Sequence, residues 1–169
     1  MSKVIERAEA EFTNSVNVTG RLAARRRVIA LTNAAAVTRT LLKSESGVLF
    51  TVDCSTVDNN IAITLPTVST EIAGVYYDFA FTVNSDDDAD FSITTGADGT
   101  DIYGGIVTLA ANSTVDAFNG ISKITVDGSV AQTCEGLLLS LLCDGTNWHL
   151  SGHIATAVGT VHLVGAGSA

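Results

Sequence analysis

The feature that most constrains the fold is a series of short segments in which apolar and polar residues alternate. The stretches "VLFTVDC" (residues 48–54), "NIAITLP" (60–66) and "YYDFAFTVN" (76–84) place apolar residues at every second position. A period of two is that of a β-strand with one buried face, and β-branched and aromatic residues favour strands. The alternation predicts three inward-facing groups: Val48, Phe50, Val52 and Cys54; Ile61, Ile63 and Leu65; and Tyr77, Phe79, Phe81 and Val83.

Similar short segments continue along the chain, at residues 90–96, 101–109, 113–118 and 121–128. They are separated by residues that favour turns, and no sustained helical period interrupts them. Many short strands at this spacing are typical of a sandwich or a barrel. The sequence therefore predicts an all-β body, an antiparallel β-sandwich or barrel of jelly-roll-like type.

The run "LLLSLLC" (residues 137–143) differs from these strands because it is apolar on both faces apart from Ser140. Such a strand must be covered on both sides, and in an antiparallel sheet a neighbouring subunit can provide the second cover. We therefore expect Leu137, Leu139 and Leu141 to lie at a subunit interface. The turn "DGTN" and a return strand then complete a hairpin, with Trp148, Leu150, Gly152 and Ile154 inward and His149, Ser151 and His153 outward.

Composition points to self-association. Only 16% of the 169 residues are charged and 46% are hydrophobic, and the mean hydropathy is +0.34. Few charged residues are then available to cover the surface of a monomer, and obligate subunit interfaces are apolar. We therefore expect a self-associating chain that consists of one domain plus an extension. No apolar run approaches the roughly 18 residues of a membrane span, and the charged start of the chain is unlike a secretory signal.

Charge divides the chain into two parts. Residues 1–43 carry eight of the nine cations and three acids, a net charge of +5, whereas residues 44–169 have a net charge of −14. We interpret residues 1–43 as an extended basic N-terminal arm and residues 44–169 as the β-body. Nucleic acid is a poor partner because the acidic body would repel it. The arm suits carboxylates of a partner protein, with a solvated charge run as the alternative. The expected binding residues are Arg21, Arg25, Arg26, Arg27 and Arg39.

Candidate metal and catalytic residues have simpler explanations. On a strand, His149 and His153 are about 13 Å apart, too far to share one ion, and no residues near Cys143 complete a zinc set. The acidic stretch "SDDDAD" (residues 85–90) lacks the glycine and closing glutamate of an EF-hand loop. "GADGTDIYGG" (96–105) is similar to a single calcium-binding nonapeptide, which works only in stacked copies. We expect no metal, no cofactor and no catalytic centre.

The three cysteines have no paired spacing. Cys54, Cys134 and Cys143 are odd in number and form no CxxC motif. An odd set of this kind is typical of free, buried thiols in a reducing compartment. We therefore expect a protein that is made in a cytoplasm.

Several of these segments together resemble a known family. "SGVLFTVDCST", the "LP" that ends the next strand, "ITTGADGTDIYGG" and "LLCDGTNWHLSG" resemble the head decoration proteins of tailed bacteriophages and related fibre modules. The likeness covers residues 44–155. It implies a homotrimeric β-domain that sits on the outer surface of an assembled capsid, bound to the major capsid protein, and stabilises it. From the charge and the short apolar runs we expect no nucleic-acid or membrane partner.

Three functions remain open at this point. A decoration protein would stabilise the capsid where its subunits meet. A fibre or receptor-binding module would contact the host surface and should present aromatic residues on its loops, yet most aromatics here fall inside strands. An enzyme that processes polysaccharide needs a pair of carboxylates in a cleft, and no pair in this sequence has a recognisable signature. We therefore expect a structural virion protein and not an enzyme.

Overall fold

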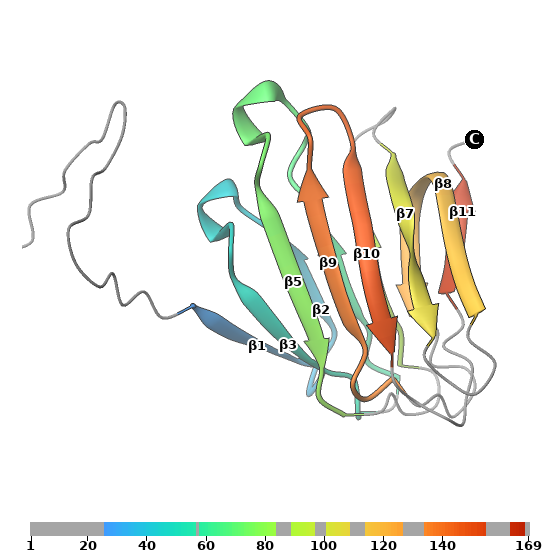
Figure 1. Ribbon diagram of the computed structural model, residues 1–169. Helices are drawn as coiled ribbons and strands as arrows, with labels where there is room; N and C mark the ends of the chain where they lie inside the picture. The colour runs from blue at the N-terminus through green and yellow to red at the C-terminus, as the bar shows by residue number, and fades with distance from the viewer. Residues whose placement is uncertain are drawn as a thin grey trace, which may run out of the picture.

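The chain forms one mixed β-sheet that curls into a nearly closed barrel (Figure 1). The computed structural model describes residues 26–56, 58–83, 89–96, 101–108, 114–126, 134–154 and 163–167. Within these residues the strand order is β1-β3-β5-β9-β10-β7-β8-β6-β4-β2, and β11 pairs with β8. The strands are β1 (Val28–Thr32), β2 (Val37–Thr40), β3 (Leu49–Asp53), β4 (Ile61–Thr64), β5 (Tyr76–Phe81), β6 (Phe91–Thr94), β7 (Ile102–Thr108), β8 (Thr114–Val126), β9 (Leu138–Cys143), β10 (Trp148–Ile154) and β11 (Leu163–Gly167).

The first six strands form three stacked rungs, each made of two strands. Within each rung the chain passes from one layer of the barrel to the other, so β1, β3 and β5 pair in parallel in one layer and β2, β4 and β6 in the other. Figure 1 shows β2 lying behind the layer that contains β3, β5 and β9. Two short 3-10 turns, η1 (Lys43–Glu45) and η2 (Thr70–Ile72), return the chain from one rung to the next. Glu45 anchors η1, since one carboxylate oxygen accepts the Leu42 amide at 3.0 Å.

The remaining strands cover the third rung and close the barrel. β9 is antiparallel to β5, and β8 is antiparallel to β6. β10 pairs with β9 and with β7, and β7 pairs with β8, so these strands connect the two layers. Half of the ten strand pairings within the described ranges are parallel. Four of these five join successive rungs, which repeat the same path, whereas a meander of hairpins would alternate direction; the fifth is β7 with β10.

Aromatic side chains fill the space between the two layers. Phe79 of one layer meets Phe91 of the other, with ring centroids 5.6 Å apart, and Trp148 lies 5.7 Å from Tyr77. Burial raises the pKa of Tyr77 to about 12, and its hydroxyl donates to the Leu42 carbonyl at 2.9 Å. Each such ring contributes roughly 1.5–3 kcal/mol by leaving water, so these rings hold the layers together.

The structure confirms the all-β class and the barrel-like architecture, and it confirms most inward positions. All of the predicted core residues of β3, β4, β5 and β10 are buried except Val83, which follows the end of β5 and is 37% exposed, and Gly152, which is partly exposed. The purely antiparallel arrangement is corrected to a mixed sheet. The predicted domain boundary at residue 44 is also corrected: β1 and β2, which lie before it, pair with β3 and β4 and belong to the barrel. Residues 1–25 lie outside the described part of the chain.

The cysteines are placed as expected. Cys54, Cys134 and Cys143 are buried and form no disulfide within the described part of the chain. Burial is the largest cause that raises the pKa of the Cys54 thiol, to about 12, and a smaller contribution comes from Cys134. A thiol with such a pKa is almost wholly protonated at neutral pH, so Cys54 acts as a small apolar core residue.

Candidate interaction surface on the outer sheet face

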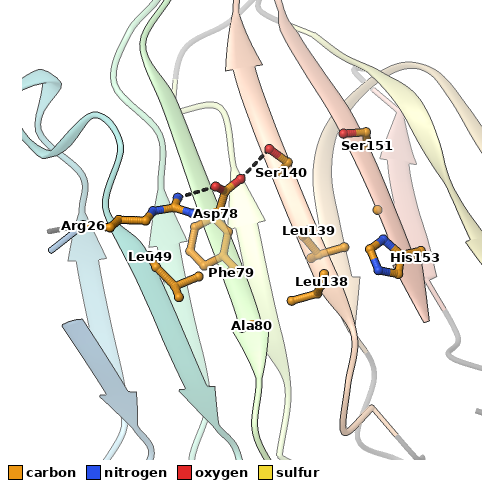
Figure 2. Close-up of a pocket in the computed structure, with 11 residues that line it drawn as sticks. Arg26, Leu49, Asp78, Phe79, Ala80, Leu138, Leu139, Ser140, Ser151 and His153 are labelled. Atoms are coloured by element: carbon orange, nitrogen blue, oxygen red, sulfur yellow. Dashed lines mark hydrogen bonds and ion pairs between the residues drawn. The ribbon is translucent and has the colours of Figure 1, made fainter. Parts of the chain in front are cut away.

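A groove of about 520 Å³ lies on the outer face of β3, β5, β9 and β10. We call it the outer groove, and Figure 2 shows the side chains around it. The strand alternation that sends Phe79 and Leu139 toward the core sends their neighbours in sequence to this face. The lining residues are Arg26, Leu49, Asp78, Phe79, Ala80, Leu138, Leu139, Ser140, Ser151, Gly152 and His153.

Strand register brings polar residues from distant parts of the sequence into one row of the groove. Asp78 of β5 pairs with Ser140 of β9, and Ser140 pairs with Ser151 of β10. Side chains at paired positions on the same face lie close enough to interact. The next row holds Ala80, Leu138 and His153. The groove therefore has one polar row and one mostly apolar row.

At the centre of the polar row, both oxygens of the Asp78 carboxylate have a partner. The Arg26 guanidinium pairs with Asp78, and the Ser140 hydroxyl donates to the other Asp78 oxygen (Figure 2). Arg26 also donates from Nε to the Gly47 carbonyl at 2.7 Å and from Nη2 to the Val48 carbonyl at 3.2 Å. These bonds fix the guanidinium at the end of the groove.

Exposed apolar side chains flank the groove. Leu138 and Leu142 of β9 are 40% and 47% exposed, and Tyr76 and Val107 are 42% and 37% exposed. Tyr76 pairs with Leu142 in the register of β5 and β9, so these two lie side by side on the face. Clustered apolar side chains on an outer sheet face mark a site of protein contact more often than scattered ones do.

His149 is bound to the turn that precedes β10. Asp144 Oδ1 accepts the amides of Thr146 and Asn147, both at 2.7 Å, and Oδ2 lies 2.7 Å from His149 Nε2. The hydrogen bond from His149 is the largest cause that lowers the pKa of Asp144, to about 2. His149 therefore stabilises the turn. In the described ranges, no three or more His, Cys, Asp or Glu residues are grouped to hold a metal ion.

The predicted arginines are placed differently from one another. Arg21 and Arg25 lie outside the described residues. Arg39 pairs with Glu45 and its guanidinium carbon lies 5.6 Å from the centroid of the Phe50 ring. Arg26 and Arg39 are therefore engaged by carboxylates of their own chain, while Arg27 is exposed. Of the predicted residues that the structure describes, only Arg27 keeps a free guanidinium for a carboxylate of another protein.

The predicted interface leucines are corrected by the structure. Leu137, Leu139 and Leu141 are 0%, 2% and 0% exposed. They lie in the core of a single chain, so a second copy cannot contact these three side chains. The exposed residues of the same strand are the alternate ones, Leu138 and Leu142. Sequence periodicity alone offered no way to choose, because both faces of this strand are apolar.

Sequence reasoning missed the polar row of the groove. One weak signal was present: Ser140 is the only polar residue in its run, and Asp78 is the only charged residue in β5. Their contact joins residues 62 apart in sequence, and only the strand order β5-β9 brings them together.

Comparison with known proteins adds no assignment. No family model matches the chain, and no curated protein matches it. The described residues also contain no helix that is long and apolar enough to cross a membrane.

Proposed function

We propose that this chain is a structural virion protein that binds the outside of an assembled phage capsid and stabilises it. It would act as a homotrimer at sites where capsid subunits meet, after synthesis in the host cytoplasm. The observation that supports this most directly is the apolar outer face around β9, where Leu138 and Leu142 are 40% and 47% exposed. The resemblance of residues 44–155 to head decoration proteins supports the same role.

A second copy is the occupant that best fits the outer face. Only 16% of the chain is charged, so few charged side chains are available to surround the exposed leucines. Leu138, Leu142 and Tyr76 lie on neighbouring strands β9 and β5, which makes the apolar surface continuous. Fully burying an aliphatic side chain of this size contributes roughly 1.5–3 kcal/mol. Packing this face against copies of itself would remove Leu138, Leu142 and Tyr76 from water.

Basic residues near the start of the chain would contact the capsid. Eight of the nine cations precede residue 44, while the rest of the chain has a net charge of −14. Arg27 is exposed at the start of β1. A basic end would turn toward capsid carboxylates, and the acidic remainder would face outward, where like charges keep particles apart.

Replacing both exposed leucines with aspartate should weaken self-association without unfolding the barrel. For the double variant Leu138→Asp and Leu142→Asp we expect the association constant to fall about tenfold or more, since two buried leucines are lost from the contact. Sedimentation velocity at micromolar concentration measures it. The control is Leu42→Asp, whose side chain is 59% exposed at the N-cap of η1 and does not belong to β5 or β9. If the double variant and the control have equal association constants, the outer face is not the surface through which copies associate.

Copy number tests the virion role itself. Virus particles purified from cells that encode the chain should contain it in numbers near those of the major capsid protein, as measured by quantitative mass spectrometry. A few copies per particle would instead indicate a fibre or receptor-binding module. Absence from purified particles would contradict both roles.

A further inference from the structure

In the described part of the chain, the first rung leaves one edge of the barrel unpaired. Among the described residues, β1 pairs only with β3, and β2 pairs only with β4. The third rung, in contrast, is covered by β9 and β8. Edge strands expose a row of unpaired N–H and C=O groups, and natural proteins cover such edges. Stacked repeats also require a terminal cap.

The sequence just before this edge repeats the sequence of the first rung. Residues 12–22 read "FTNSVNVTGRL", and residues 31–41, which span the end of β1 to the residue after β2, read "LTNAAAVTRTL". Five of the eleven positions are identical and the first position is apolar in both. The identical pairs are Thr13 and Thr32, Asn14 and Asn33, Val18 and Val37, Thr19 and Thr38, and Leu22 and Leu41.

The shared residues have defined roles in the first rung. Leu31 and Leu41 are buried at 4% and 1% exposure. Asn33 is 1% exposed and binds the loop of the next rung: its amide donates to the carbonyls of Thr56 at 2.7 Å and Asn59 at 2.9 Å, and its oxygen accepts the Thr56 amide at 3.0 Å. An asparagine at this position therefore ties one rung to the following one.

We propose that residues 12–22 dock on the open edge of their own chain as a fourth rung. Phe12 and Thr13 continue the layer of β1, and Val18 and Thr19 continue the layer of β2, in parallel and in register with Leu31, Thr32, Val37 and Thr38. Asn14 then binds the loop between β1 and β2, as Asn33 binds the loop after β3. The inference is independent of the proposed capsid role.

The connection is long enough for docking within one chain. The path from Leu22 to Val28 must step about 4.8 Å between paired strands and cross about 10 Å between layers. Six residue steps reach about 20 Å when extended. This arrangement places the cluster Arg25–Arg27 in the turn between rungs, in the same series as η1 and η2. The basic residues then form part of the folded end of the barrel.

Engineered disulfides test the register. In the full-length chain, the pairs Thr13→Cys with Thr32→Cys and Thr19→Cys with Thr38→Cys should each form an intramolecular disulfide on mild oxidation, because paired neighbours fall within the Cα separation that a disulfide spans. Thr32 and Thr38 are exposed, so neither change disturbs the core. The native cysteines are buried at 0–1% exposure and should not compete.

The matched control is Thr13→Cys with Thr38→Cys, which joins positions assigned to opposite layers. Non-reducing electrophoresis and intact mass should show cross-linking in most molecules for the two in-register pairs and in few for the control. Adding Asn14→Ala should reduce the in-register yield and speed amide hydrogen exchange in β1 and β2. Equal yields in all three pairs, no cross-link, or a cross-link between two chains would overturn the proposal.

Discussion

Replacing Gly104 with alanine should lower the free energy of unfolding by about 3–5 kcal/mol, since two separate costs add at this position. Gly104 has φ +126°, a conformation that residues with a Cβ rarely adopt. A Cβ there would also lie 1.9 Å from the Leu150 carbonyl oxygen, which belongs to the paired strand β10. Relief would require β7 and β10 to separate, and these strands help to connect the two layers of the barrel. Denaturant unfolding monitored by Trp148 fluorescence measures the change.

Substitutions at two other glycines measure the backbone strain and the crowding of the added Cβ separately. Gly136 has φ +84°, and a Cβ added to it would meet nothing within 4 Å, so Gly136→Ala should cost only the backbone strain, about 1–2 kcal/mol. Gly152 has an ordinary φ, but a Cβ would lie 2.7 Å from the Leu138 carbonyl oxygen, so Gly152→Ala reports crowding alone. If Gly104→Ala proves no more costly than Gly136→Ala, the close packing of β7 against β10 is wrong.

Replacing Asn33 with alanine should cost about 2–4 kcal/mol of the free energy of unfolding, since each typical hydrogen bond contributes about 1 kcal/mol and an unsatisfied buried group costs about 1–3 kcal/mol. The change removes three hydrogen bonds and leaves the Thr56 amide and the Thr56 and Asn59 carbonyls without their partner. A domain of this size loses about 2–4 °C of Tm per kcal/mol, so thermal unfolding resolves the effect.

Asn60 is the matched control for Asn33. Within the described residues, its side-chain oxygen accepts one hydrogen bond, from the Asp90 amide at 2.7 Å, at an exposed position. Water can replace that bond, so Asn60→Ala should cost about 1 kcal/mol or less. Similar losses in the two variants would mean that Asn33 does not hold the first rung to the second.

Local alternation was enough to predict which side chains of most strands face the core. In β3, β4 and β10 the period of two was sufficient, because burying one face of a strand requires that alternation whatever its neighbours are. Phe50, Ile63 and Trp148 are buried as their positions predicted. The turn at "DGTN" and the all-β class followed from the same local pattern.

The limits of β-structure were harder to predict at the edge of the barrel. β1 and β2 carry exposed residues such as Val28 and Thr38, and among the described residues each pairs with a single neighbouring strand. Their weak alternation made residues 26–43 look like part of an extended arm. The structure shows that pairing with β3 and β4 makes them strands.

Strand pairing, its direction and the identity of the exposed leucines depend on contacts between distant parts of the chain. Parallel pairing depends on rungs that recur after 21 residues between Val28 and Leu49 and 29 residues between Leu49 and Asp78, a spacing that local periodicity does not contain. The run around Ser140 is apolar on both faces, so no period distinguished Leu138 from Leu139. That choice was made by the packing of β9 between β5 and β10, which turns Leu139 into the core and leaves Leu138 beside the outer groove.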